Sequence, residues 1–299
     1  MRRLVWILPL LAAVIAAWFL NRNRERARRW LAPCCILVIA VCAALVVPKL
    51  IRVPGMTVTA LDVGQGQCLV IRSGTATAVV DCGSSSVDAP DDRLISWLRS
   101  AGVTQVDLLV LTHYHSDHCS GVPGLLKKMP VRSAVLPPPD DEVTWDESIR
   151  RLAYEYGCSV YTVGDSAVGL SFGEASARVW PPLAEEGENE RCLAVLFSRG
   201  SFDALVTGDM PASGERMLVS LKELPDTEVL VAGHHGSAFS SCDEFLDAVT
   251  PEIILISVGA NEYGHPADVT LRRLARHGAE ILRTDELGSI TVTSDMEVR

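Results

Sequence analysis

The histidines of this chain are concentrated where a metal site could be built. Six of the seven lie in three short segments, each of which follows a strand-like apolar run. The densest segment, residues 113–118, offers three imidazoles and one carboxylate: His113, His115, Asp117 and His118. Imidazole and carboxylate are the ligands of zinc and of harder ions such as manganese. Burying four such groups together without an ion would be costly, so their spacing predicts a metal site.

The element that must position this segment is the apolar run at residues 106–111, directly before it. This run is rich in Val and Leu and predicts a buried strand. A strand that ends in a turn can direct all four polar side chains into one cleft at the edge of a sheet. Further strand-like runs occupy residues 56–61, 68–72 and 77–80.

Strand and helix patterns alternate in the later part of the chain. This order predicts a single α/β domain with two sheets in the middle, rather than two domains. Helical periodicity is present in residues 91–101, 144–156, 212–224, 243–249 and 267–277.

The first 50 residues differ from the rest in charge and hydropathy. They hold 8 of the 27 Lys and Arg and 1 of the 37 Asp and Glu, which gives this segment +7 and the remaining 249 residues −17. Two uncharged apolar runs of 17 residues, 4–20 and 31–47, just reach the length of a membrane-spanning helix. The positive-inside rule places the Arg-rich residues 21–30 in the cytoplasm and the acidic body outside the cell.

These features predict three parts: two transmembrane helices with a cytoplasmic Arg-rich loop (1–50), a linker (51–56) and a soluble domain (57–299) anchored at the cell membrane. The alternative is a cleaved signal peptide followed by a buried helix. It does not explain a second full-length apolar run, and no small-x-small cleavage site lies before the arginines. The hydrophobic content of 48% excludes a disordered chain.

Five further motifs narrow the interpretation. Together with His-x-His-x-Asp-His, they make the chain resemble the metallo-β-lactamase superfamily and, within it, the C-terminal domain of ComEC-type DNA-uptake proteins. The resemblance covers about residues 57–293. The motifs are Leu61-Asp-Val-Gly-Gln-Gly-Gln67, Val79-Val-Asp-Cys-Gly83, Leu205-Val-Thr-Gly-Asp209, Gly233-His-His-Gly-Ser237 and Asn261-Glu-Tyr-Gly-His-Pro266.

The resemblance implies an αββα metallo-β-lactamase sandwich, preceded here by the two transmembrane helices, with two divalent ions at the sheet edge. Either zinc or manganese suits the ligands. His113 and His115 would hold one ion. Asp117 and His118 would hold the other, and Asp209 would bridge the two.

Each ion still needs a further ligand, and the later histidines can supply it. No histidine occurs between His118 and His234, so the third ligand of the first ion must be His234 or His235, or be absent. We favour His234 there and His265 at the second ion, with the choice between His234 and His235 left open. His235 would then orient the substrate or protonate a leaving group.

Three more residues are candidates for contact with a substrate. Ser237 and the backbone after His235 could bind a phosphate oxygen, and Asn261 and Tyr263 could also contact the substrate. Ordinary turn residues would explain these positions equally well. The chain departs from the family pattern at three places: Gln67 replaces an Asp, Ser120 replaces a Gly, and Cys192 stands where a Ser is common.

Two ions about 3.5–4 Å apart would activate a water and neutralise charge on a phosphorane, which suits phosphodiester hydrolysis with Asp117 and His235 in catalytic roles. The resemblance implies a membrane-anchored, extracytoplasmic nuclease that acts on DNA, single-stranded in form, during competence-type uptake beside a channel protein. One alternative is a hydrolase of a cell-envelope phosphodiester such as phosphorylcholine. Another is a non-catalytic accessory module of a DNA-uptake channel.

Charge argues against tight DNA binding by the domain alone. Affinity for DNA depends on Lys and Arg, and a body at −17 repels phosphate. Two metal ions would contribute about +4 inside the cleft. A local basic patch is possible from Arg72, Arg150, Arg151, Arg191 and Arg199. The nine cysteines form no Cys-x-x-Cys pair, which argues against a structural zinc site.

Overall fold

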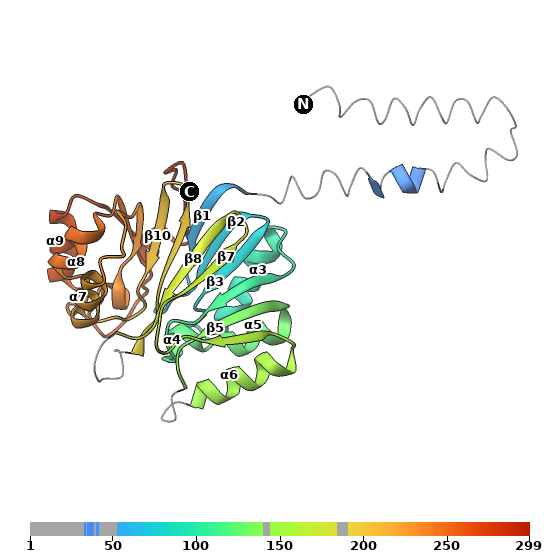
Figure 1. The fold of residues 1–299 in the computed structure, drawn as a ribbon, viewed down its shortest axis with the longest axis horizontal. Coiled ribbons are helices and arrows are strands. Elements are labelled where there is room, and N and C mark those ends of the chain that lie inside the picture. Colours follow the sequence, from blue (N-terminus) through green and yellow to red (C-terminus); the bar gives the residue numbers. More distant parts are fainter. Residues whose placement is uncertain (1–32, 34, 39, 42–52, 140–143, 184–190) are drawn as a thin grey trace, which may run out of the picture. The chain divides into compact units, whose positions relative to one another are not determined.

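The computed structural model describes residues 33, 35–38, 40, 41, 53–139, 144–183 and 191–299. The chain divides into two units, Met1–Arg52 and Val53–Arg299, and every element described below belongs to the second (Figure 1). The two predicted membrane-spanning runs lie outside the described residues, apart from a few positions between 33 and 41. Among the residues that are described, no helix is long and apolar enough to cross a membrane.

Two seven-stranded sheets form the centre of the domain, in the orders β14-β1-β2-β3-β4-β5-β6 and β13-β12-β11-β10-β9-β8-β7. The strands of the first sheet are β1 (Val53–Ala60), β2 (Leu69–Gly74), β3 (Ala76–Val80), β4 (Val106–Val110), β5 (Val131–Leu136), β6 (Ser159–Thr162) and β14 (Ile290–Thr293). Those of the second are β7 (Val168–Phe172), β8 (Ala175–Trp180), β9 (Ala194–Arg199), β10 (Phe202–Val206), β11 (Val229–Val231), β12 (Ile253–Ile256) and β13 (Glu280–Arg283).

Helices cover the outer face of each sheet, so the domain has four layers and confirms the predicted αββα sandwich (Figure 1). The helices packed on the first sheet are α3 (Pro90–Ser100), α5 (Val122–Lys128) and α6 (Thr144–Glu155), and those on the second are α7 (Ala212–Ser220), α8 (Asp243–Val249) and α9 (Asp268–Arg276). Shorter helical turns lie in the connections: α4 (Ser116–Cys119), η2 (Gly233–Gly236) and α10 (Thr284–Leu287).

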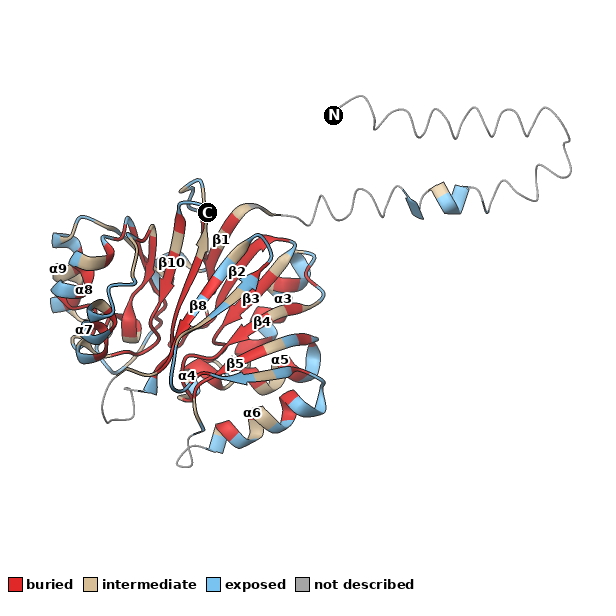
Figure 2. Ribbon diagram, in the orientation of Figure 1, coloured by how far each residue is buried: buried red, intermediate tan, exposed pale blue. Residues whose placement is uncertain are grey.

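Side chains of the central strands alternate between two cores. In β3, Ala78 and Val80 pack between the two sheets, whereas Val79 packs beneath the helices of the first layer. Successive side chains of a strand point to opposite faces, so a strand that is covered on both sides must be apolar throughout. This explains the continuous apolar runs in the sequence. Figure 2 shows both sheets as largely buried and the outer surfaces of the helices as exposed.

The parallel strands determine where polar residues can gather. Strands β3 to β6 run parallel to one another, and so do β10 to β13. Parallel strands present their carboxyl ends at the same edge of a sheet, which is where α/β proteins place their ligand sites. The loops after β4, β10, β11 and β12 carry the predicted metal-site residues.

The structure differs from the sequence-based boundaries in two respects. Strand β1 starts at Val53, four residues before the predicted domain start at Thr57, and therefore includes part of the predicted linker. The strands from β5 to β9 were not among the predicted elements. Strand β6 is mostly exposed, so it lacks the apolar pattern of a buried strand. The six cysteines of the domain are all buried.

Candidate metal centre

The segment after β4 forms one helical turn at the edge of the first sheet. His115 precedes α4, and its carbonyl accepts the backbone N–H groups of His118 and Cys119 at 3.0 Å each. This turn gives the segment two pairs of ligands with different neighbours. His113 and His115 form one possible metal-holding group with Asp209, whereas Asp117 and His118 form a second group with Asp209 and His235. Within each group, the ligand atoms all lie within 4.8 Å of one another.

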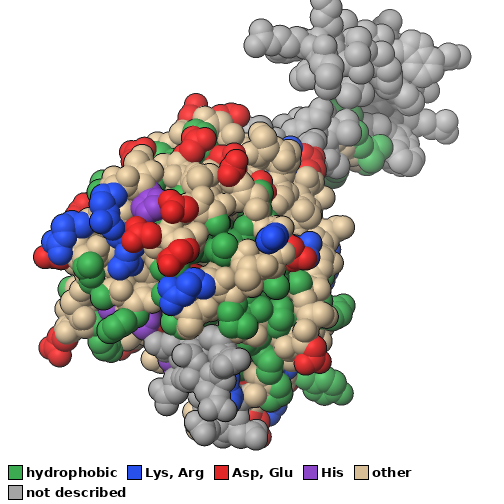
Figure 3. All heavy atoms as spheres, turned by 60° about the vertical axis from the view of Figure 1, so that its left-hand side comes forward, with side chains coloured by type: hydrophobic (Ala, Val, Ile, Leu, Met, Phe, Trp, Pro, Cys, Tyr) green, Lys and Arg blue, Asp and Glu red, His purple; other side chains and the backbone are tan. Residues whose placement is uncertain are grey.

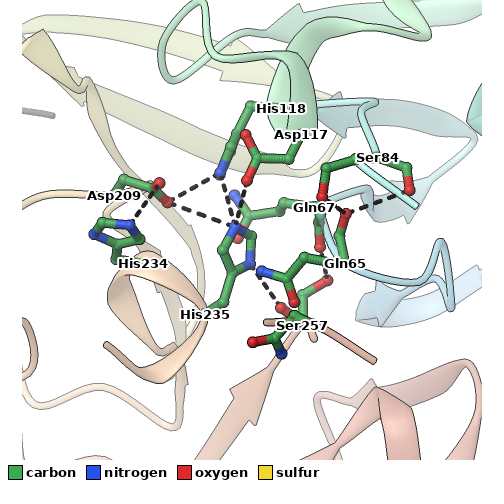
Figure 4. Close-up of polar contacts among 12 residues, drawn as sticks. Gln65, Gln67, Ser84, Asp117, His118, Asp209, His234, His235 and Ser257 are labelled. Carbon is green, nitrogen blue, oxygen red and sulfur yellow. Dashed lines mark hydrogen bonds and ion pairs between the residues drawn. The ribbon is translucent and has the colours of Figure 1, made fainter. Parts of the chain in front are cut away.

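Asp209, on the turn after β10, belongs to both groups, and Figure 4 shows its carboxylate between His118 and His234. Its Oδ1 atom is 2.9 Å from Nε2 of His118. Its Oδ2 atom is 3.7 Å from Nε2 of His113 and 3.5 Å from Nε2 of His234. The carboxylate is buried, and each of its oxygens faces a different half of the site. This is the arrangement expected of a bridging ligand.

A second carboxylate, which the sequence analysis did not assign to the site, contacts the ring nitrogen of His118 that faces away from Asp209. Oδ2 of Asp81, in the loop after β3, lies 2.7 Å from Nδ1 of His118. Asp81 also accepts hydrogen bonds from the backbone and hydroxyl of Thr112, both at 2.7 Å, and from Nε2 of Gln67 at 2.8 Å. A carboxylate on one ring nitrogen fixes the tautomer and directs the other nitrogen toward a metal. Asp81 and Gln67 both lie within the sequence motifs given above, and their place in those motifs could have indicated a role at the site.

The adjacent residues His234 and His235 point to different halves of the site. Both have left-handed backbone angles, with φ of 50° and 52°. Their rings are 6.3 Å apart and inclined by 75°. His235 is buried, donates from Nδ1 to the carbonyl of Ser257 at 2.7 Å, and places Nε2 3.3 Å from Asp117 and 3.2 Å from His118 (Figure 4). It therefore stands where the sequence analysis expected His265.

His265 belongs to neither metal-holding group within the described part of the chain. Its ring lies 5.3 Å from that of His234 and stacks against Tyr263, with 6.1 Å between centroids. The difference from the expectation has a physical cause. The left-handed conformations of the β11 turn direct His235 into the second group. His234, like His265, belongs to neither group, but its Nε2 lies 3.5 Å from the shared carboxylate of Asp209.

The three predicted substrate residues have different environments. Ser237 is buried, and its Oγ accepts the backbone N–H of Phe239 at 3.3 Å. Among the residues that the structure describes, the side chain of Asn261 bonds only within its own loop, to the backbone of Gly259, Tyr263 and His265. Tyr263, by contrast, is exposed. Of the three, it is the side chain that is free to meet a substrate.

The charges of the cluster are strongly coupled. Burial favours a raised pKa for Asp209, but His118, His113 and His235 hold it well below its usual value. Burial likewise opposes ionisation of Asp117, and the hydrogen bond from His235 nevertheless lowers its pKa. Burial and the neighbouring His118 lower the pKa of His113 well below the usual value. The two carboxylates are thus ionised and His113 is neutral, as metal binding requires. Against the effect of burial, Asp209 and Asp81 raise the pKa of His118, which would have to release its proton when an ion binds.

The residues fit a divalent metal on a further observation. Within the described residues, the buried Nε2 atom of His113 has no hydrogen-bond partner. A buried imidazole nitrogen without a partner is costly, and an ion at this point would satisfy it. The donors are imidazole and carboxylate throughout, which suits zinc or manganese. Two groups that share Asp209 provide room for two ions.

The predicted basic patch does not form a single surface. Arg72 is buried in β2, Arg150 of α6 pairs with Asp146, and Arg199 at the end of β9 pairs with Glu174. These residues belong to different elements, and the positive charges of Arg150 and Arg199 are offset locally by their acidic partners.

A four-layer αββα sandwich with clustered His and Asp residues at one sheet edge defines a metallohydrolase class of domain. Residues 61–259 match the family model described as the metallo-beta-lactamase superfamily, and the chain belongs to that superfamily. The fold is shared with the metallo-beta-lactamase fold protein YhfI from Bacillus subtilis, at a TM-score of 0.57 and 13% identity over 80% of this chain and 100% of that one.

Competence proteins are among the relatives, which confirms the resemblance drawn from the motifs. The chain is 32% identical over 200 residues to ComE operon protein 3 of Bacillus subtilis (strain 168), covering 66% of this chain and 26% of that protein. It is 31% identical over 284 residues to Competence protein ComA of Neisseria gonorrhoeae, covering 87% and 38%. The chain therefore spans roughly a quarter to two fifths of these relatives' length, and is a metallo-β-lactamase-fold hydrolase related to them.

Proposed function

We propose that this protein is a membrane-anchored, extracytoplasmic, metal-dependent phosphodiesterase that cleaves single-stranded DNA during competence-type uptake, beside a channel protein. The observation that supports it best is the position of Asp209, whose two oxygens face two separate groups of ligands. Such a pair of sites is typical of enzymes that hydrolyse phosphate esters. The kinship with competence proteins supports DNA as the substrate.

In this proposal two sets of ligands share Asp209. His113, His115 and His234 would hold one ion, and Asp117, His118 and His235 would hold the other. When bound, two divalent ions supply positive charge for a phosphoryl oxygen and lower the pKa of a water molecule.

The other residues position these ligands. Asp81 holds Nδ1 of His118, and the carbonyl of Ser257 holds Nδ1 of His235. The Ser257 carbonyl engages Nδ1 of His235, which leaves Nε2 beside Asp117 and His118 within the second group of potential ligands. We therefore assign it to metal binding rather than to proton transfer. His265, partly exposed beside His234, is left to contact the substrate.

The proposal is tested with the full 299-residue chain in mild detergent, loaded with manganese or zinc. Substrates are single-stranded DNA, double-stranded DNA and bis-p-nitrophenyl phosphate. Asp209→Ala and His115→Ala should abolish metal-dependent cleavage. His277→Ala is the matched control. His277 follows the last residue of α9, pairs with Asp243 and lies outside both ligand groups. Metal-bound chain that cleaves no diester would contradict the proposal.

The acidic body supports one alternative substrate. A domain at −17 attracts DNA poorly, whereas a small zwitterionic envelope diester carries little net charge. Cleavage of p-nitrophenyl phosphorylcholine without cleavage of DNA would indicate this function. The accessory-module alternative has less support, because both groups of potential ligands are intact.

A further inference from the structure

Two large aromatic side chains are exposed on the loops that carry the later histidines. Phe239 is 78% exposed and Tyr263 is 68% exposed. They follow β11 and β12, which are neighbouring parallel strands whose carboxyl ends lie at the edge of the metal centre. Single exposed apolar residues are common on protein surfaces, so a function for either one needs further support.

Tyr263 has that support, because it begins a row of rings that leads to the metal centre. Its ring is stacked on His265, with 24° between the planes. The His265 ring lies 5.3 Å from that of His234. Nε2 of His234 is in turn 3.5 Å from the carboxylate of Asp209. The exposed phenol ring is therefore connected to the shared carboxylate through two imidazoles.

The loop presents Tyr263 in a fixed position. Nδ2 of Asn261 donates to the carbonyls of Gly259 and His265, both at 2.8 Å. Its Oδ1 accepts the backbone N–H groups of Tyr263 at 3.0 Å and His265 at 3.1 Å. Four hydrogen bonds from one side chain thus organise the loop. A rigid aromatic ring loses little conformational entropy when a ligand packs on it.

Paired arginines offer little attraction to a phosphodiester outside the metal centre. Figure 3 shows acidic and basic side chains interleaved on the face it displays. Several arginines of the second sheet and its helices are paired. They are Arg276 with Asp243, Arg283 with Asp285 and Glu286, and Arg216 with Glu244. Base stacking on an aromatic ring does not depend on such charges.

We propose that Tyr263 is the stacking platform for a nucleobase next to the scissile phosphodiester. This inference rests on the proposed function and defines its substrate class as single-stranded nucleic acid, whose bases are free to stack. One face of the ring is packed on His265 while the side chain stays exposed, which suits a planar base. A quaternary ammonium group is instead held by aromatic rings on several sides.

The test compares the wild-type full-length chain with Tyr263→Ala and Tyr263→Phe. The matched control is Tyr154→Ala, because Tyr154 is an 88% exposed tyrosine on α6, packed on the other sheet. Two probes are used: a single-stranded thymidine oligonucleotide, and the same oligonucleotide with abasic sites. Binding is measured by fluorescence anisotropy in EDTA, and KM and kcat are measured with manganese. Circular dichroism checks that each variant is folded.

The wild-type chain should bind the base-containing oligonucleotide more tightly than the abasic one. Tyr263→Ala should weaken binding of the former about tenfold and raise its KM similarly, with the abasic probe unaffected. Tyr263→Phe, which keeps the ring, and Tyr154→Ala should both behave as wild type. Equal binding of the two oligonucleotides by the wild-type chain would overturn the inference.

Two further outcomes separate the inference from the proposed function. Base-dependent binding that Tyr263→Ala loses, without hydrolysis by the metal-loaded wild-type chain, would support stacking and contradict the nuclease. Hydrolysis that Tyr263→Ala leaves unchanged would support the nuclease and overturn stacking. Binding of glycerophosphocholine that depends on Tyr263, with oligonucleotide binding unaffected, would also overturn it in favour of a quaternary ammonium ligand.

Discussion

His234 and His235 are neighbours in the chain, yet their rings are 6.3 Å apart and inclined by 75°. Each has a positive φ angle, a conformation that residues other than glycine adopt rarely. This strained turn directs His235 inward to Asp117 and leaves His234 partly exposed beside Oδ2 of Asp209. Strain of this kind is tolerated where function requires a particular geometry.

The two histidines should therefore hold different ions. We expect His235→Ala and His234→Ala each to lose roughly one of two bound ions, while His265→Ala retains both, since three protein ligands are typical of such sites. Metal content after dialysis, measured by mass spectrometry, checks this stoichiometry, with His277→Ala as the control. Loss of an ion from His265→Ala, with His235→Ala still fully loaded, would contradict the assignment.

Asp81 should matter for metal affinity although it is not a ligand. Asp81→Asn keeps the size of the side chain but weakens the hold on Nδ1 of His118, so we expect metal affinity to fall about 10- to 100-fold. Calorimetric zinc titration measures the change. The control is Asp107→Asn. Asp107 also accepts a hydrogen bond, from the backbone of Thr77, and pairs with Arg132, but it belongs to neither ligand group. An affinity within twofold of wild type would show that Asp81 has no positioning role.

Gln67, which departs from the family pattern, donates to the buried carboxylate of Asp81. The nearly isosteric substitution Gln67→Glu would place a second carboxylate against that of Asp81, where the two negative charges repel each other. It would also remove the hydrogen-bond donor of Gln67. We expect a loss of about 1–3 kcal/mol of stability at neutral pH, recovered in part as acid protonates the pair. Thermal unfolding at pH 5 and pH 7 measures it, against Gln105→Glu on the loop before β4. Equal unfolding of both variants would contradict the expectation.

Glu215 should make stability depend on pH. Burial raises its pKa above the ordinary 4.5, although the backbone N–H groups of Ser241 and Cys242 partly oppose this. The folded chain thus keeps this proton to higher pH than the unfolded chain. The contribution to stability is full below pH 4.5 and is lost as pH rises through the raised folded-state pKa.

Glu215→Gln removes this titration, with a cost that does not vary with pH because one backbone N–H loses its acceptor. Relative to wild type, the variant should therefore gain stability as pH rises from 4.5 toward 7. Midpoints of thermal unfolding at four pH values, measured in EDTA for both chains, give the difference. A difference that stays constant with pH would show that Glu215 does not titrate in this range.

The proposed anchor and orientation can be tested in cells. Removal of residues 1–50 takes away both apolar runs and the Arg-rich segment, so the shortened chain should move from the membrane fraction to the soluble fraction. Protease added to intact spheroplasts should digest the domain of the full-length chain, because the positive-inside rule places it outside. Protection of the domain until the spheroplasts are lysed would reverse the proposed orientation.

The sequence alone predicted the layered fold and most of the His and Asp residues that the structure brings together around Asp209. The apolar runs are continuous because the strands are covered on both faces, and the motif at residues 113–118 concentrates ligands after one of them. The strands from β5 to β9 were not predicted. For β6 the reason is that it is mostly exposed and carries no buried pattern, whereas β5 and β9 are largely buried and their apolar residues were passed over. The periodicity of apolar residues indicates which side chains are buried, so it gives no strand signal where most side chains are exposed, as in β6.

Only the tertiary structure decided which histidines lie beside Asp209 and Asp117 and which groups hold their rings. Asp81 and His118 are 37 residues apart, and they meet because β3 and β4 are parallel neighbours. His118 and His235 are 117 residues apart, and they lie in turns that follow strands of different sheets, β4 and β11. The direction of a side chain depends on the backbone angles of its own turn. Its partners depend on the packing of the two sheets, and neither is encoded in residue type and spacing.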